Sequence, residues 1–372
     1  MINFWTIKLT AFKSAFKALT YNQISDLSLI MGMVLYFNEF STLNFMDLNS
    51  SPTFGHVGIA ACLLFYVSAC CKSAQFFFHF WLPDSMEAPV PASALIHSAT
   101  LVSAGIFLVL KMRPIVSQSL LLETVIIVSS TLTIIVGGVS AALQNDLKKT
   151  LAYSTISNCG LIMLSTCITT VDNSYLLFAI HGIFKAYTFF CVGSLIIVHA
   201  HKQDWRYVSA VSAAHPSLAI VTIFSLYNLG AWDNSLYYLI KHGSANEVLQ
   251  TCSFFKNSLL STSLLFITVT SAIYSIKVVY LVNFKKLNLL KYVPINCRVA
   301  PAITTGAFVI LVTAGLYFYH TSPAAALAVQ NFTIIHHLNT TFVFGLLAFF
   351  AKSTAVLFFF KNFAGRSEEN LK

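Results

Sequence analysis

The sequence predicts an all-α, polytopic integral membrane protein with about ten transmembrane helices. Hydrophobic residues make up 57% of the 372 residues, charged residues make up only 9%, and the mean hydropathy is +0.75. Soluble proteins carry about 25% charged residues, so this chain has too few to cover a surface in contact with water. Apolar stretches of about 20 residues, the length that spans a bilayer, recur from residue 23 to residue 361. A soluble domain held by a single anchor is therefore excluded.

The apolar stretches define the expected membrane helices. Their ranges are 23–44, 56–82, 92–112, 120–142, 149–170, 174–200, 214–241, 257–284, 299–319 and 335–361. Residues 1–22 are expected to form an interfacial amphipathic helix rather than a cleavable signal. The reason is that Lys8, Lys13 and Lys17 interrupt the apolar positions every few residues.

The net charge of +9 is explained by membrane topology and does not indicate nucleic-acid binding. When Lys and Arg are placed on alternating sides of the helices, one side receives only Lys111, Arg113 and Lys256. The other side receives Lys8, Lys13, Lys17, Lys148, Lys149, Lys202, Arg206, Lys285, Lys286, Lys291, Arg298, Lys361, Arg366 and Lys372. Positive residues concentrate on the cytoplasmic or matrix side of membrane proteins, so both termini are expected on that side.

The eight cysteines do not indicate a redox or metal centre. They form no CxxC pair and no Cys/His spacing typical of zinc or iron–sulfur sites. Most lie within apolar runs, where cysteine behaves as a small buried hydrophobic residue. No cofactor and no metal is therefore expected on this chain.

Five lysines remain inside the apolar runs, where a charge costs several kcal/mol. They are Lys72, Lys185, Lys241, Lys277 and Lys352. A lysine near a helix end usually extends its ammonium group to the interface. That is the expected fate of Lys352, whereas for Lys277 the structural and functional interpretations are equally favoured. Lys72 and Lys185 lie too centrally, which favours a functional role.

Two segments combine such lysines with histidine or proline. The first runs from Cys71 to Ser98, with Lys72 inside one helix, prolines in the connection and His97 in the next helix. A helix broken at membrane depth is tolerated only beside protein or a wet cavity. The second, residues 143–158, precedes a histidine and a lysine spaced i, i+4 on one helix face. A single buried histidine more often only packs, but histidine with buried lysine suits a proton relay.

The motifs together resemble a known family. Lys72–Gln75, the Trp81-Leu82-Pro83 turn, Pro89–His97 and Gln144–Ser157 are similar to the antiporter-like subunits of respiratory complex I, NADH:ubiquinone oxidoreductase. The form of these motifs is closer to chain 5 than to its paralogues, chains 2 and 4. The family is related to the large subunit of multisubunit sodium/proton antiporters. The resemblance runs to about residue 210 and thins afterwards.

The resemblance implies two inverted five-helix repeats, each with a broken helix, as in other transporters. It implies that Lys72 is the broken-helix lysine of the first repeat and that His97 continues the relay toward the centre. Lys148 would be the central lysine, followed by His181 and Lys185.

The first half departs from the family's pattern in three ways. The family pairs its lysine with a glutamate on a helix that precedes Asp26, and this sequence has no such helix. Either a second polypeptide supplies the glutamate or the lysine has lost its partner. Gln23 stands where the family has an arginine, and Leu177 stands where it has a second histidine, one turn before His181.

The second repeat also departs from the pattern. The expected proline after the helix is Trp232, and the family's lysine corresponds to Lys241, displaced by one residue and without an adjacent acid. Asp233 is the candidate replacement for that acid. The candidate site residues are thus Lys72, His97, Lys148, His181, Lys185, Lys241, Asp26 and Asp233.

The resemblance divides the chain into four parts. These are the interfacial helix 1–22, the remainder of a truncated first repeat 23–115, the second repeat 116–285, and C-terminal helices with a tail 286–372. The family's long lateral helix has no counterpart after residue 361. The chain is therefore expected to be the later portion of a divided subunit.

We expect a proton-translocating, antiporter-like subunit of mitochondrial NADH:ubiquinone oxidoreductase, in the inner membrane with both termini in the matrix. NADH, FMN, iron–sulfur clusters and ubiquinone would bind other subunits of that enzyme. Expected partners are lipids and other membrane-arm subunits, including the antiporter-like chain 4 and the chain that supplies the glutamate, with no nucleic acid. Two alternatives stay open: a subunit of a multisubunit cation/proton antiporter, and a structural remnant that braces the membrane arm without conducting.

Overall fold

The structure is a computed structural model that describes residues 2–283 apart from several gaps. The gaps are residues 6, 45–54, 99, 200, 206–207, 209–215, 233–234, 236, 239–240 and 242–253. Asp233, Lys352, the expected helices over 299–319 and 335–361, and the expected division 286–372 therefore lie outside the described residues.

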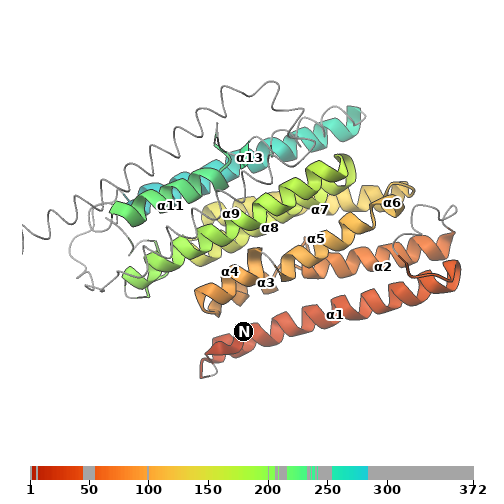
Figure 1. The fold of residues 1–372 in the computed structure, drawn as a ribbon, viewed down its shortest axis with the longest axis horizontal. Coiled ribbons are helices and arrows are strands. Elements are labelled where there is room, and N and C mark those ends of the chain that lie inside the picture. The colour runs from red at the N-terminus through yellow and green to blue at the C-terminus, as the bar shows by residue number, and fades with distance from the viewer. Residues whose placement is uncertain are drawn as a thin grey trace, which may run out of the picture.

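Helices, joined by turns and loops, make up the secondary structure of the described residues. Its elements are η1 Ile2–Phe4, α1 Leu9–Phe40, α2 His56–Lys72, α3 Trp81–Asp84, η3 Ser85–Glu87, α4 Val90–Ser98, α5 Leu101–Lys111, α6 Arg113–Val116, α7 Leu120–Leu143, α8 Leu147–Ile168, α9 Val171–Val198, α11 Pro216–Leu229 and α13 Phe254–Asn283. Among these residues the only strand-like pairing is an isolated bridge between Asp146 and Asp204. The long helices lie nearly parallel in one bundle, which confirms the predicted all-α class (Figure 1).

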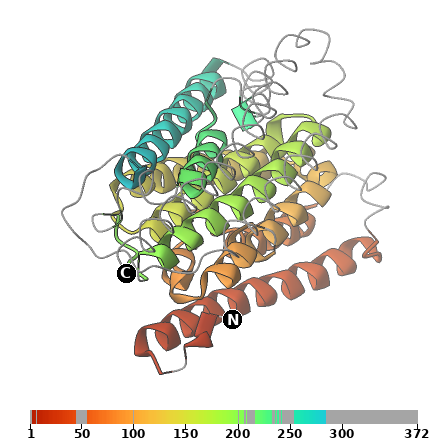
Figure 2. The same ribbon diagram turned by 60° about the vertical axis from the view of Figure 1, so that its left-hand side comes forward.

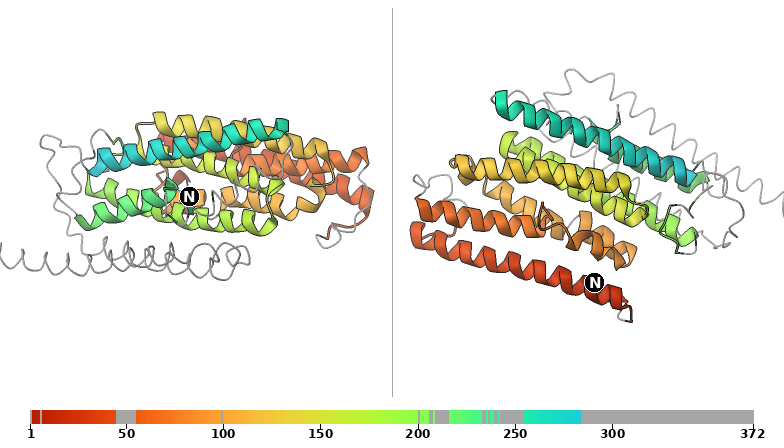
Figure 3. Two further views of the ribbon diagram at one scale, coloured as in Figure 1. Left: turned by 90° about the horizontal axis from the view of Figure 1, so that it is seen from above. Right: turned by 180° about the vertical axis from the view of Figure 1, so that it is seen from behind.

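The bundle follows the order of the sequence from one edge to the other. α1 forms one edge and α13 lies toward the opposite edge, as Figure 2 and the right view of Figure 3 show, while the left view of Figure 3 looks down on the bundle from above. Between them α8 occupies the centre, with 83% of its most apolar window buried by the rest of the protein. Lys148 of α8 and His181 and Lys185 of α9 therefore have protein around them rather than lipid.

Five helical stretches among the described residues are long and apolar enough to cross a membrane. They are Val90–Lys111, Leu120–Leu143, Leu147–Ile168, Val171–Val198 and Thr262–Val279. The outward faces of α1 and α7 are lined with exposed large hydrophobic side chains, among them Phe12, Phe16, Leu27, Val34, Leu121, Val128 and Leu132. Contiguous apolar surface on this scale is stable in lipid and not in water. The chain is therefore a multi-pass membrane protein, as predicted.

α1 differs from the prediction. It is one continuous helix of 32 residues rather than an interfacial helix over 1–22 followed by a membrane helix over 23–44. No glycine or proline occurs between Leu9 and Met31, so nothing ends the helix at residue 22. Small residues on one face let α1 pack closely on α2 along much of its length. These buried residues are Ala11, Ser14, Ala18, Ser25, Ser28 and Gly32.

The two helices that were expected to be broken are indeed interrupted. The expected helix over 56–82 stops at Lys72, and the expected helix over 214–241 stops at Leu229. Lys72 is thus the last residue of its helix and does not lie well inside it, contrary to the prediction.

Candidate functional site

The first break closes the end of α2 by hydrogen bonds. Ala74 has a positive φ of 52°, and the amide of Gln75 donates to the carbonyl of Cys70 at 3.0 Å. The indole N–H of Trp81 donates to the carbonyl of Cys71, also at 3.0 Å. A left-handed residue just past the helix end is the usual way to satisfy the last carbonyls. The break therefore leaves these backbone groups paired at membrane depth, as an apolar environment requires.

α5 packs directly on this broken end. A Cβ atom added at Gly105 would collide with the carbonyl of Ala69 and lie 3.0 Å from the amide of Ser73. Only glycine permits this approach of the two backbones. The prolines that follow in the sequence lie beyond the break and do not cause it.

Lys72 is paired with Asp26, which the sequence alone did not predict. The Lys72 Nζ lies 2.7 Å from Asp26 Oδ1, so the carboxylate comes from α1. The Lys72 side chain is 23% exposed and the Asp26 side chain is 61% exposed. Beside the pair, a hydrogen bond of 3.0 Å from Ser25 Oγ to the Ser68 carbonyl joins α1 to α2. At the first break, on the flank of the bundle, the carboxylate of Asp26 therefore balances the charge of Lys72.

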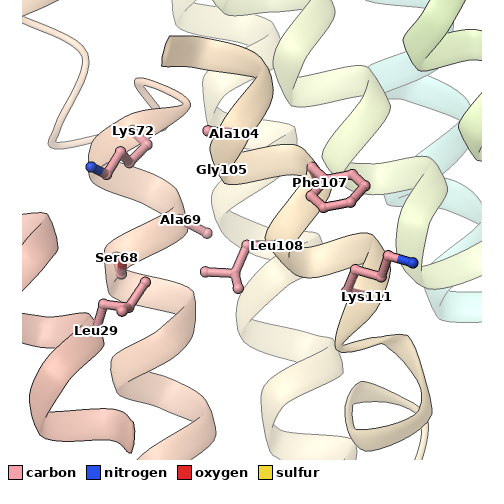
Figure 4. A pocket seen from close by; sticks show the side chains of 9 residues that line it. All are labelled: Leu29, Ser68, Ala69, Lys72, Ala104, Gly105, Phe107, Leu108 and Lys111. Atoms are coloured by element: carbon pink, nitrogen blue, oxygen red, sulfur yellow. The ribbon is translucent and has the colours of Figure 1, made fainter. Parts of the chain in front are cut away.

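An apolar pocket of about 340 Å³ opens at this flank between α1, α2 and α5. Figure 4 shows Lys72 near one end of the pocket and Lys111 near the other, with Leu108 between them. Within the described residues, no hydrogen bond or ring contact joins Lys72 to His97. The structure therefore separates the first two members of the predicted relay.

His97 is buried at the centre of the first half, with 1% of its surface exposed. Its Nε2 lies 3.1 Å from the Ser85 hydroxyl, and its ring stacks on Phe189 with centroids 5.6 Å apart. Its Nδ1 has no hydrogen-bond partner among the described residues. One ring nitrogen is therefore held by the protein while the other is open to a water molecule or a proton.

Lys148 reaches the same short segment from α8. Its ammonium donates to the carbonyls of Ala88 at 3.1 Å and Met86 at 3.5 Å, and only 6% of the residue is exposed. The carboxylate of Glu87 interacts with it electrostatically. The connection between α3 and α4 thus binds both His97 and Lys148.

Lys185 and His181 share one face of α9, as their spacing predicted. Lys185 is fully buried, and its ammonium donates to the hydroxyl of Ser154 on α8 at 2.5 Å. It also interacts electrostatically with both His97 and His181. The structure therefore brings these three titratable groups into one region.

Neutral polar groups on α8 extend this region toward residue 237. The ring of His181 lies 6.5 Å from the ring of Tyr237, whose hydroxyl donates to Asn158 Oδ1 at 3.1 Å. Asn158 Nδ2 donates in turn to the carbonyl of Ser154 at 2.9 Å. The His181 Nε2 has no hydrogen-bond partner among the described residues. This second histidine thus also has one nitrogen available.

The second break repeats the backbone geometry of the first. Ala231 has a φ of 52°, and the amide of Trp232 lies 3.5 Å from the carbonyl of Tyr227. The indole of Trp232 donates to the hydroxyl of Ser275 on α13 at 3.2 Å. The tryptophan at the position of the family's proline therefore takes part in closing the break.

Lys241 lies after this break and is buried, with 1% exposed. Its ammonium donates to the Ser271 hydroxyl at 3.2 Å, and that hydroxyl lies 3.2 Å from the carbonyl of Gly230. Ser271 therefore connects the lysine to the broken end of α11.

The groups that contact the lysines and histidines were not predicted from the sequence. These are the hydroxyls of Ser85, Ser154 and Ser271 and the carbonyls of Met86 and Ala88. Ser85 and Ser154 lie inside the motifs already noted, but serine is frequent along the chain, so its identity alone does not mark a partner. In the described residues no group of three or more His, Cys, Asp and Glu side chains is placed to hold a metal. That this chain carries no cofactor stays a prediction.

Comparisons with known proteins place the chain in a family. The family described as NADH:quinone oxidoreductase/Mrp antiporter, transmembrane, matches residues 1–268. NADH-ubiquinone oxidoreductase chain 5 of Paramecium tetraurelia is 40% identical over 300 residues, which cover 75% of this chain and 50% of that protein. The protein of the same name from Chondrus crispus is 32% identical over 310 residues, which cover 78% and 46%. The chain thus spans about half the length of the curated relatives it matches.

A solved structure agrees with the fold. A chain of the membrane-bound sulfane sulfur reductase, an archaeal respiratory membrane complex, aligns with a TM-score of 0.72 at 19% identity. The alignment covers 84% of this chain and 65% of that one, and it supports the architecture alone. From the family match over residues 1–268, the chain belongs to the NADH:quinone oxidoreductase/Mrp antiporter transmembrane family.

Proposed function

We propose that this chain is a proton-translocating, antiporter-like subunit of mitochondrial NADH:ubiquinone oxidoreductase. The observation that carries the proposal is the buried group of His97, Lys148, His181 and Lys185 at the centre of a membrane bundle. In the described part of the chain no salt bridge joins any of the four to a carboxylate, although Glu87 interacts electrostatically with Lys148; their hydrogen-bond and ring contacts are to hydroxyls, carbonyls and aromatic rings. The relatives named NADH-ubiquinone oxidoreductase chain 5 support the assignment to that enzyme.

Such an arrangement suits proton transfer because neutral partners serve either protonation state. A serine hydroxyl accepts a hydrogen bond from a charged lysine and can donate one to the neutral amine. Since Lys185 interacts with both His97 and His181, a proton on one of them opposes a proton on its neighbours. A proton that arrives at one position therefore favours release from the next.

The Lys72–Asp26 pair would serve as the switch at the flank. Closed, the pair is neutral; opened, it leaves a charge without a partner in apolar surroundings, which is costly. A conformational change elsewhere in the enzyme that separates the two groups would thus leave the Lys72 charge to find another partner. The redox cofactors and ubiquinone are assigned to other subunits in this proposal.

We further propose that a helix of a partner subunit, bearing a glutamate, covers the pocket beside Lys72. The support is the exposure of both members of the ion pair next to an apolar pocket on a membrane-facing flank. Other membrane-arm subunits, including the antiporter-like chain 4, are proposed partners on the strength of the relatives' names.

The proposed orientation places the basic end of the bundle in the mitochondrial matrix. Lys17 contacts Asp84 and Lys148 contacts Ala88, so the cations of α1 and α8 meet at one end. Lys111 ends the Val90–Lys111 span at the other. The excess of positive charge at the first end supports this orientation.

Purification from native membranes tests the assignment to the enzyme. NADH-oxidising and iron–sulfur subunits should co-purify with the chain. Small antiporter subunits in their place would overturn the proposal in favour of a cation/proton antiporter, which the family also includes.

Proton transport by the reconstituted enzyme tests the relay. Lys185→Met should lower the number of protons moved per NADH oxidised while the enzyme still assembles. Unchanged stoichiometry would favour a bundle that braces the membrane arm without conducting.

A further inference from the structure

Lys277 on α13 binds the end of another helix. Its ammonium donates to the carbonyls of Ala142 at 2.8 Å and Gln144 at 3.0 Å, at the C-terminal end of α7. It also lies 5.3 Å from the ring centroid of Trp205. The last carbonyls of a helix lack partners within the helix and carry the negative end of its dipole, so a cation is favoured there. The ammonium group of Lys277 is therefore used to hold α7 rather than to reach solvent.

The turn that Lys277 holds is also bound from a second side. The amide of Leu147 donates to the carbonyl of Gln203 at 2.9 Å, and the amide of Trp205 donates to the carbonyl of Asn145 at 3.1 Å. Lys277 contacts the ring of the same tryptophan. Residues 144–147 are thus fixed between α13 on one side and residues 203–205 on the other.

This turn leads directly into Lys148. The carbonyl of Asp146 accepts hydrogen bonds from both the amide and the hydroxyl of Thr150. These bonds close the first turn of α8. Lys148 is the second residue of that helix, and its ammonium reaches Ala88 across the bundle. A hydrogen bond tolerates a shift of only a few tenths of an ångström, so the position of the turn decides whether this contact forms.

We propose that Lys277 is a positioning residue for Lys148. It clamps the α7–α8 turn so that the Lys148 ammonium stays at the carbonyls of the α3–α4 connection. The inference rests on the proposed function, because it assigns Lys277 to the proton relay through Lys148. It also couples α13 to the α3–α4 connection through α7 and α8.

The test compares three variants in the assembled, reconstituted enzyme. Lys277→Met should lower proton transport per NADH about tenfold, since small displacements of a reacting group have large effects on rate. Lys277→Arg should restore most of it, because a guanidinium donates to both carbonyls and stacks on an indole. Lys13→Met is the control: Lys13 is an exposed lysine of α1 outside the proposed relay and pocket, and its loss should change nothing.

Hydrogen exchange of the 144–150 amides provides a second readout. Exchange should accelerate in Lys277→Met and stay slow in Lys277→Arg. If the methionine variant does not assemble, Lys277→Gln keeps one donor and takes its place. Normal transport in an assembled Met or Gln variant with accelerated exchange would overturn the positioning role.

A Lys148→Met variant separates this inference from the proposed function. If that variant transports protons normally, the relay through Lys148 fails, and the proposed function with it. If it blocks transport while Lys277→Met does not, only the role of Lys277 fails.

Discussion

α2 and α11 end in the same way although they are far apart in sequence. Each has an alanine in the left-handed region two residues beyond its last residue, Ala74 and Ala231, with φ of 52° at both. In each case the next amide is directed back to the carbonyl five residues earlier, and a nearby tryptophan, Trp81 or Trp232, hydrogen-bonds through its indole. The two helices are thus interrupted inside the membrane by the same backbone geometry.

The lysines beside the two breaks are held differently. Lys72 precedes its alanine by two residues, is partly exposed and has the carboxylate of Asp26 as a partner. Lys241 follows its alanine by ten residues, is buried and binds the hydroxyl of Ser271. The comparison shows that the position of a break does not determine the electrostatics beside it. The first break has an ion pair, Lys72–Asp26, whereas the lysine at the second break contacts the dipole of a hydroxyl group, that of Ser271.

Loss of the lysine at the second break should have the largest effect. Lys241→Met removes a titratable group with no second lysine in the described residues around Ser271. Proton transport in the reconstituted enzyme should fall about 100-fold, the scale of a lost proton-transfer group. Lys13→Met, at an exposed position of α1, is the control and should transport normally. Full transport by Lys241→Met would show that the second break has no relay lysine at this position.

Removing the carboxylate at the first break should have a smaller effect. Asp26→Asn keeps the shape but leaves the Lys72 ammonium without its charge partner in apolar surroundings. Transport should fall about tenfold and recover in Asp26→Glu.

Glu39→Gln provides the matched control for Asp26→Asn. Glu39 lies on the same helix, and its carboxylate accepts a hydrogen bond from the amide of Gly55 at 3.0 Å. Equal losses in the two variants would mean that the Lys72–Asp26 pair has no specific role.

Removing the hydroxyl at the second break should lower proton transport less than Asp26→Asn does. Ser271→Ala deletes the hydrogen bond that the hydroxyl accepts from Lys241, worth about 1 kcal/mol or roughly fivefold in an equilibrium constant, together with the hydroxyl's own contacts to the carbonyls of Gly230 and Thr268. Transport measured alongside Asp26→Asn should therefore fall less in the serine variant. The reverse order would show that the hydroxyl, and not the carboxylate, is the more important partner.

The sequence predicts the class of fold well because apolar runs are a strong local signal, and isolated charges within those runs mark the candidate site residues, whose roles stay a prediction. It does not locate the breaks. Prolines drew attention to residues 83–91, whereas α2 ends at Lys72 and the chain turns at Ala74, a residue with no preference for the left-handed region. The Lys72–Asp26 pair and the clamp by Lys277 join distant helices, so no spacing along the chain reveals them.

The equivalence of the two breaks can be tested at the alanines themselves, where the smallest effect is expected. A non-glycine residue in the left-handed region costs about 1 kcal/mol, so Ala74→Gly and Ala231→Gly should each stabilise their break by a similar amount. Ala61→Gly, in the interior of α2, should instead destabilise by about 1 kcal/mol and serves as the control. Hydrogen exchange of peptides that contain Gln75 and Trp232 reports the change locally. Slower exchange at both positions would confirm that the breaks are built alike, whereas slower exchange at one alone would mean that only that break depends on its left-handed residue.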